Sequence, residues 1–164
     1  MKTWIKYIVA ALLVNSGCIP EKNDPKTILN KLVDEGKATD IVNDTTYIDV
    51  KGILKHRTKP YTGLIYLLNA DCSFCVGQFL YFLSYLKDNN VNLPVLILVE
   101  EAGTGAARFY MEKTGFDDFK SIEFVENSNQ QIVNDGIENI SSTVILIVEN
   151  EETGRFLCDG FELY

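Results

Sequence analysis

The sequence predicts an α/β sandwich: a mixed sheet with central parallel strands and an antiparallel edge hairpin, and helices on both faces. Three short, continuous apolar runs are typical of buried strands, at residues 63–68, 93–100 and 143–149. A helical pattern follows each of the first two runs, and such alternation favours parallel strand pairing. A turn and a further short strand follow the third run, which favours an antiparallel hairpin.

The first half of the chain is predicted to contain two helices and two strands. Residues 26–35 form the first helix, because their apolar residues share one face and Gly36 follows their end. Residues 45–50 are predicted to form a strand, and residues 63–68 form the first buried strand. Residues 76–87 continue as a helix of about three turns, with apolar side chains at helical spacing.

The second half begins with the buried strand at 93–100. Pro94 stands at the start of this strand, where a missing N–H is tolerated. Residues 105–114 are predicted to form a helix that ends at Gly115. The remaining elements are a strand at 121–125, one or two helical turns at 129–134, a strand at 143–149, a turn at 150–154 and a strand at 155–158.

The start of the chain is typical of a secretory signal segment. Residues 1–6 are basic, and the apolar stretch at 7–14 is too short to span a bilayer. Small residues then precede Cys18, and this arrangement resembles a bacterial lipoprotein signal, in which the cysteine after the cleavage site is lipidated. The alternative is an ordinary signal peptide followed by a chance cysteine. We expect a signal peptide at 1–17, a lipidated tether with the first helix at 18–44, and the folded domain at 45–164.

These segments predict a protein of the cell envelope that is lipid-anchored to the membrane, facing the periplasm or the cell surface. The formal net charge is −8, and loss of Lys2 and Lys6 with the signal would leave 13 basic and 23 acidic residues. A chain this acidic is a poor partner for nucleic acid or for anionic lipid head groups. The 147 residues after the signal are enough for one domain, which we expect to be a monomer.

Four cysteines are present, and two of them form a Cys-x-x-Cys motif between a strand and a helix. Cys72 and Cys75 stand where the buried strand gives way to the helix. Thiolates at a helix start meet free N–H groups and a partial positive charge, which lower their pKa to about 3.5–7.5 from about 8.5. Cys158 is expected to be a small buried apolar residue; the alternatives are a resolving thiol or a disulfide to another chain.

The order of strand, Cys-x-x-Cys, helix, strand and helix, followed by the hairpin, resembles the thioredoxin fold over about residues 45–162. It is most similar to the membrane-tethered thioredoxin-like proteins of the bacterial envelope, and the extra strand near 121–125 suits that group. The resemblance implies a thiol–disulfide oxidoreductase acting on protein or peptide partners. Cys72 would attack and Cys75 would resolve, with the Cys72–Cys75 disulfide in place of any other cofactor.

The resemblance also implies a substrate groove around Ser73, Phe74, Ser142 and Thr143. The chain differs from the family at three positions. Ser142 stands where the family has a cis-proline. We expect the peptide bond before Ser142 to be trans, because a cis bond before a residue other than proline costs about 2.5–4 kcal/mol.

The other two differences lie close to the cysteine motif. Tyr66 stands where the family often has a buried acid, six residues before the first cysteine. Asp71 stands in place of the tryptophan that precedes this cysteine, and is expected to cap the helix. Its charge would oppose ionisation of Cys72.

Two alternatives to redox chemistry remain for the cysteine pair. A structural disulfide that only staples the helix start would make the domain a binding or structural lipoprotein without redox activity. A metal half-site needs further ligands, and His56 and Cys158 lack the spacing to supply them, so no metal site is predicted. His56 is expected at the surface.

Two further groups of residues have both a structural and a functional interpretation. Phe74, Gln78, Tyr81 and Tyr85 share one helix face, either as core packing or as an apolar rim beside the thiols. Glu100 and the acid that follows it end a strand, where a solvated loop is the expectation and a site the alternative.

Overall fold

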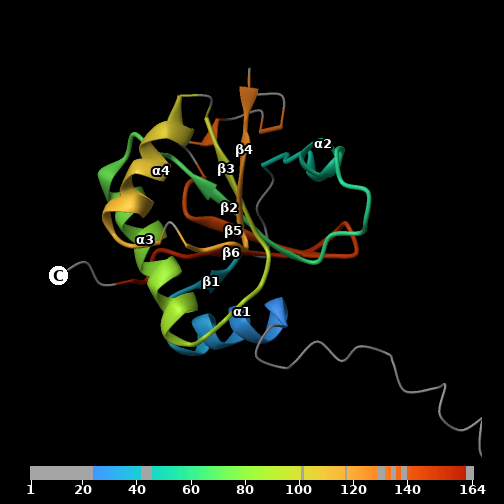
Figure 1. Ribbon diagram of the computed structural model, residues 1–164. Coiled ribbons are helices and arrows are strands. Elements are labelled where there is room, and N and C mark those ends of the chain that lie inside the picture. Colours follow the sequence, from blue (N-terminus) through green and yellow to red (C-terminus); the bar gives the residue numbers. More distant parts are fainter. Residues whose placement is uncertain are drawn as a thin grey trace, which may run out of the picture.

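The computed structural model describes residues 24–41, 46–100, 102–116, 118–128, 132–133, 136–137 and 140–161. These residues form a mixed α/β fold around one sheet (Figure 1). The elements are α1 (Pro25–Asp34), β1 (Thr39–Asp40), α2 (Val50–Leu54), β2 (Gly63–Leu68), α3 (Ser73–Asp88), β3 (Val95–Val99), α4 (Gly103–Lys113), β4 (Ile122–Glu126), β5 (Thr143–Val148) and β6 (Glu151–Leu157).

The described strands form a six-stranded sheet in the order β1-β6-β5-β2-β3-β4. Strands β2, β3 and β4 run parallel, whereas β5 is antiparallel to β2, and β6 is antiparallel to β5. The predicted α/β class, the central parallel strands and the antiparallel hairpin are therefore confirmed. The hairpin is not the edge of the sheet, because the two-residue strand β1 pairs with the outer side of β6.

Helices cover both faces of the sheet, as predicted, but unequally. One hydrophobic cluster joins the sheet to α1, α3 and α4, and a second cluster joins the other face to the short helix α2 and to Val133 and Ile137. Strands β2, β3 and β4 follow one another across the sheet in a single direction. Right-handed crossovers between them place α3 and α4 on the same face, and Figure 1 shows both on the side opposite α2.

The predicted strand at 45–50 is wrong. Ile48 forms only an isolated bridge with Val133, and helix α2 begins at Val50. Asp49 is the reason for the helix, because its side chain accepts a hydrogen bond from the Gly52 backbone N–H and so caps the first turn. Thr45 lies outside the described residues.

The predicted turn at 150–154 is also too long. Strand β5 ends at Val148 and β6 begins at Glu151, so the turn consists of Glu149 and Asn150 alone. Both residues have positive φ angles, +51° and +70°, which is the pattern of a type I′ hairpin turn. The helical turns predicted at 129–134 lie outside the described residues, except for Ile132 and Val133.

Candidate functional site: the cysteine pair

The cysteine pair lies where β2 ends and α3 begins. Cys72 is the N-cap of α3, and its sulfur accepts a hydrogen bond from the Cys75 backbone N–H at 3.2 Å. The prediction that Asp71 caps this helix is wrong. The backbone N–H of Asp71 instead donates to the Asn69 side chain, within the turn that leads to the helix. The first sulfur of the motif therefore takes the place that a capping oxygen usually occupies.

Cys72 and Cys75 form a disulfide, with their Cα atoms 5.2 Å apart. It closes the first turn of a 16-residue helix. Both cysteines are half-buried, so burial of the residues does not distinguish an attacking sulfur from a resolving one. Ser73, between them, is exposed.

The aromatic face of α3 is divided between surface and core. Phe74, beside the disulfide, is 53% exposed and Tyr81 is 39% exposed, whereas Gln78 and Tyr85 are buried. The interpretation as an apolar rim thus fits the two exposed rings, and the interpretation as core packing fits the other two residues.

Gln78 fastens the C-terminal segment to α3, a role that sequence analysis missed. Its side-chain amide donates to the Phe161 carbonyl at 2.9 Å and accepts from the Phe161 N–H at 3.2 Å. The Phe161 ring also meets the Tyr85 ring edge to face. The sequence held one indication of this role: Gln78 is a lone amide among apolar helix residues, and a buried amide side chain needs hydrogen-bond partners.

The segment before β5 is hydrogen-bonded to the end of β2, next to the turn that leads to Cys72. The Ser141 hydroxyl accepts from the Asn69 N–H at 2.9 Å, and the Ser142 N–H donates to the Leu67 carbonyl at 2.8 Å. No described peptide bond is cis, so the expected trans bond at Ser142 is confirmed. Ser142 instead has a φ of +68°, in the left-handed region that few serines adopt.

Ser142 and Thr143 are 3% and 2% exposed. The backbone groups of Ser142 are also occupied, since its N–H donates to the Leu67 carbonyl and its carbonyl accepts from the Cys158 N–H, so neither residue is open to a substrate in this structure. Of the predicted groove residues, only Ser73 and Phe74 present their side chains to solvent.

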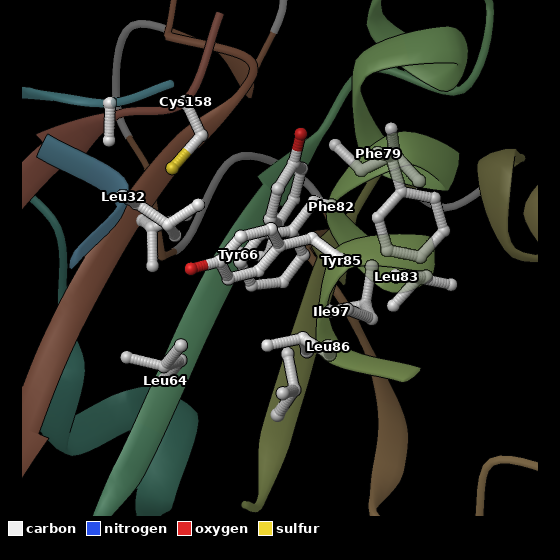
Figure 2. Close-up of a cluster of buried hydrophobic side chains, with 14 of the residues drawn as sticks. Leu32, Leu64, Tyr66, Phe79, Phe82, Leu83, Tyr85, Leu86, Ile97 and Cys158 are labelled. Atoms are coloured by element: carbon white, nitrogen blue, oxygen red, sulfur yellow. The ribbon is translucent and has the colours of Figure 1, made fainter. Parts of the chain in front are cut away.

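Tyr66 lies inside the core beneath α3. Its ring packs against Phe79 and Phe82 at centroid distances of 5.2 and 5.1 Å, and Cys158 belongs to the same cluster (Figure 2). Its buried hydroxyl makes no hydrogen bond with any described residue. Burial raises the pKa of Tyr66 well above its ordinary value, against a smaller opposite effect of the nearby Ser142 hydroxyl. Tyr66 therefore stays protonated and does not replace a carboxylate as a proton acceptor.

Cys158 is fully buried and is not part of a disulfide. Burial raises the pKa of its thiol to about 12, with a further contribution from the negative charge of Asp159. Its backbone N–H donates to the Ser142 carbonyl at 2.9 Å. Its complete burial confirms the expectation of a small buried apolar residue. A neutral, enclosed thiol is also a weak nucleophile.

Glu100 is half-buried and hydrogen-bonded rather than freely solvated. Its carboxylate accepts hydrogen bonds from the Asn127 side chain and the Ile137 N–H. The carbonyl oxygen of the buried Asn127 side chain accepts from the N–H groups of Ile132 and Val133. These bonds hold the segment after β4 against the sheet.

Within the described ranges, no three side chains of His, Cys, Asp or Glu are grouped so that they could hold a metal ion. His56 is exposed, as expected. No described helix is long and apolar enough to cross a membrane. Cys18, the predicted lipidation site, lies outside the described residues, as does the predicted signal peptide at 1–17.

Comparisons with protein-family models, with curated proteins and with solved structures found no match. The fold and the site define the chain as a mixed α/β domain that carries a disulfide-bridged Cys-x-x-Cys at the start of a helix.

Proposed function

We propose that the protein is a thiol–disulfide oxidoreductase with a thioredoxin-like domain, held in the bacterial cell envelope by a lipid on Cys18. The placement of Cys72 carries the proposal. Its sulfur is the N-cap of α3 and accepts the Cys75 N–H, so a Cys72 thiolate would be stabilised by a hydrogen bond and by the helix dipole. The exposed Phe74 ring beside the disulfide offers an apolar contact to a polypeptide partner.

The proposed reaction passes through a mixed disulfide. In the reduced protein the Cys72 thiolate attacks one sulfur of a substrate disulfide, whose S–S bond breaks and whose other sulfur leaves as a thiolate and takes up a proton. Cys75 then loses its proton and attacks the Cys72 sulfur, which releases the second substrate thiol. Two electrons pass from the Cys72–Cys75 dithiol to the substrate, and the reverse sequence oxidises a substrate dithiol.

Trapping of the mixed disulfide tests this mechanism. Cys75→Ser should accumulate disulfide-linked partners through Cys72, whereas Cys72→Ser should trap none, as judged by non-reducing electrophoresis of envelope extracts. Both variants should carry Cys158→Ala, so that with Cys18 lipidated the only free thiol is the one left in the motif. Equal trapping by the two variants, or trapping by neither, contradicts the assignment of roles.

A second interpretation is a binding domain in which the disulfide is purely structural. Tyr66 favours it, because this neutral buried side chain lies where thioredoxin-like enzymes often have an acid. Titration of the 19–164 fragment against glutathione buffers separates the two functions. A potential within the range of about −270 to −120 mV supports exchange, and a structural disulfide is expected below about −300 mV.

Anchoring is tested separately. Cys18→Ala should leave the protein without lipid and release it from the membrane fraction. A variant that remains in the membrane fraction as firmly as the wild type contradicts the lipoprotein assignment and leaves the redox proposal intact.

A further inference from the structure

A surface groove of about 1000 Å³ lies between the segment that follows α2 and the edge strand β4. His56, Lys59 and Tyr61 line one side, and Glu123 and Val125 of β4 line the other. None of the residues from Asn69 to Cys75 lines this groove, so it is separate from the cysteine pair.

The backbone of β4 is open on the groove side. The Val95 N–H donates to the Ser121 carbonyl, and the Asn127 N–H donates to the Val99 carbonyl. In a parallel strand pair, alternate residues of one strand bond to the neighbouring strand. Since Ser121 and Asn127 bond to β3, the odd-numbered residues of β4 bond to β3, and the even-numbered residues direct their N–H and C=O groups away from it. The backbone groups of Phe124 and Glu126 therefore face outward, and no hydrogen bond to them from another described residue is found.

The wall opposite β4 is basic, in a protein whose formal net charge is −8. Four basic residues and His56 fall between Asp49 and Asp71. Three acids also line the groove, but each is engaged: Asp49 caps α2, Glu123 pairs with Arg57, and Glu126 accepts from the Thr104 hydroxyl. Arg57 forms an ion pair with Glu123 across the groove and lies 4.9 Å from the Tyr61 ring centroid. The exposed side chains of Lys55 and Lys59 also line the groove, and neither forms an ion pair with a described residue. The basic residues in this stretch are Lys51, Lys55, Arg57 and Lys59.

We propose that this groove binds an extended acidic segment of a partner polypeptide, which pairs with the edge of β4 as an additional strand. The outward N–H and C=O groups of Phe124 and Glu126 would form its backbone hydrogen bonds. Alternate side chains of the added strand would lie over the apolar side chains of Val125 and Ile132. Its carboxylates would reach Lys55 and Lys59, which supplies the charge complementarity that selects an acidic partner.

The first test uses a defined probe and charge reversal. The probe is a labelled, end-blocked octapeptide of alternating valine and glutamate, titrated by fluorescence anisotropy at low salt. Lys55→Glu/Lys59→Glu should weaken its binding by about tenfold. An octapeptide of alternating valine and lysine should bind the wild type at least about tenfold more weakly than the glutamate probe. Absence of binding by the glutamate probe, or equal binding of the two peptides, overturns the proposal.

The second test blocks the strand edge while keeping the charge matched. Glu126→Pro removes an outward N–H and leaves the bonds to β3, because a proline is tolerated where its N–H would face away from the sheet. Glu126→Thr removes the same carboxylate but keeps the N–H. The proline variant should bind the glutamate probe about tenfold more weakly than the threonine variant. Equal binding by the two variants means that no strand is added, and the proposal fails.

Amide exchange on the wild type checks the same geometry without a substitution. The amides of Phe124 and Glu126 should gain protection when the probe is bound, while the amide of Val125, already bonded to β3, should change little. A chain that dimerises through β4 without the probe, shown by ultracentrifugation and by loss of the dimer in Glu126→Pro, would assign the edge to a second copy and overturn the proposal.

Discussion

The two ends of β5 share an uncommon backbone conformation but sit in different surroundings. Ser142 precedes the strand with a φ of +68°, and Glu149 and Asn150 follow it with +51° and +70°. Ser142 is 3% exposed and donates its N–H to the Leu67 carbonyl at the end of β2. Glu149 and Asn150 are exposed and form a two-residue hairpin turn.

The positive φ angles at the two ends of β5 are stabilised in two different ways. At the exposed end the hairpin itself requires positive φ, since the twist of paired strands favours this turn. At the buried end, the neighbouring strand fixes the conformation by accepting the Ser142 N–H. A change at the buried end therefore acts on tertiary structure beside the cysteine pair, and a change at the exposed end acts mainly on one turn.

The largest effect is expected from Ser142→Pro. Proline fixes φ near −65° and has no N–H, so it conflicts with the observed +68° and removes the bond to Leu67. We expect the free energy of unfolding to fall by about 3 kcal/mol or more, measured by urea unfolding.

The matched control is Ser142→Gly, which adopts positive φ readily and keeps the N–H. It should stay within about 1 kcal/mol of the wild type. A proline variant as stable as the glycine variant would show that a left-handed Ser142 is not needed at this end of β5.

The pH dependence of stability probes the buried end through Cys158. The pKa of Cys158 is about 12 in the folded protein, because of burial, against an ordinary value near 9. The unfolded chain therefore loses this proton first, so the stability that Cys158 contributes is complete below about pH 8 and is lost as the pH rises toward 12. At pH 10 the expected loss is about 1 kcal/mol.

The measurement compares the wild type with Cys158→Ala by urea unfolding between pH 7 and pH 10, both with the disulfide intact. The difference between their unfolding free energies should shift steadily in favour of the alanine variant above pH 8. Parallel curves over this range would show that the thiol is not enclosed.

Asn150→Ala tests the exposed end. The Asn150 side chain accepts a hydrogen bond from the Tyr61 N–H at 2.8 Å, just before β2, and asparagine tolerates positive φ better than alanine. We expect a loss of about 1 kcal/mol in the free energy of unfolding. Asn150→Gly restores the backbone preference alone, so it should recover part of the loss. Full recovery would mean that the bond to Tyr61 adds nothing.

The contrast between the two ends also explains which parts of the fold the sequence could predict. The buried strands at 63–68, 93–100 and 143–149 and the helix after Cys75 were confirmed, because continuous apolar runs and helical spacing record burial directly. The short strand β1 has only exposed residues, and helix α2 depends on a cap at Asp49. Neither leaves a periodic pattern long enough to detect.

At the candidate site, the position of the cysteine pair could be predicted, and its supporting contacts could not. Strand, motif and helix are consecutive in the chain, so local pattern places Cys72 at the helix start. The bonds from Gln78 to Phe161 and from Ser142 to Leu67 join segments 83 and 75 residues apart, and nothing local encodes them. The cap at Cys72 was missed because Asp71 offers a stronger capping oxygen by type, but stands one residue too early.

The smallest effect is expected from Glu149→Asn, at the first position of the hairpin turn. The backbone of Glu149 is left-handed, a conformation that costs energy for most residues. The short side chain of asparagine can offset this cost by a local hydrogen bond, and type I′ turns favour asparagine. The Glu149 N–H donates to the Thr62 hydroxyl, and this backbone bond is unaffected by the substitution. We expect a gain of about 0.5 kcal/mol in the free energy of unfolding, measured by urea titration at pH 7. Glu149→Gln is the control, since it removes the charge without changing the backbone preference. If Glu149→Gln gains as much as Glu149→Asn, the benefit comes from lost negative charge, and the turn conformation at this end of β5 carries no strain.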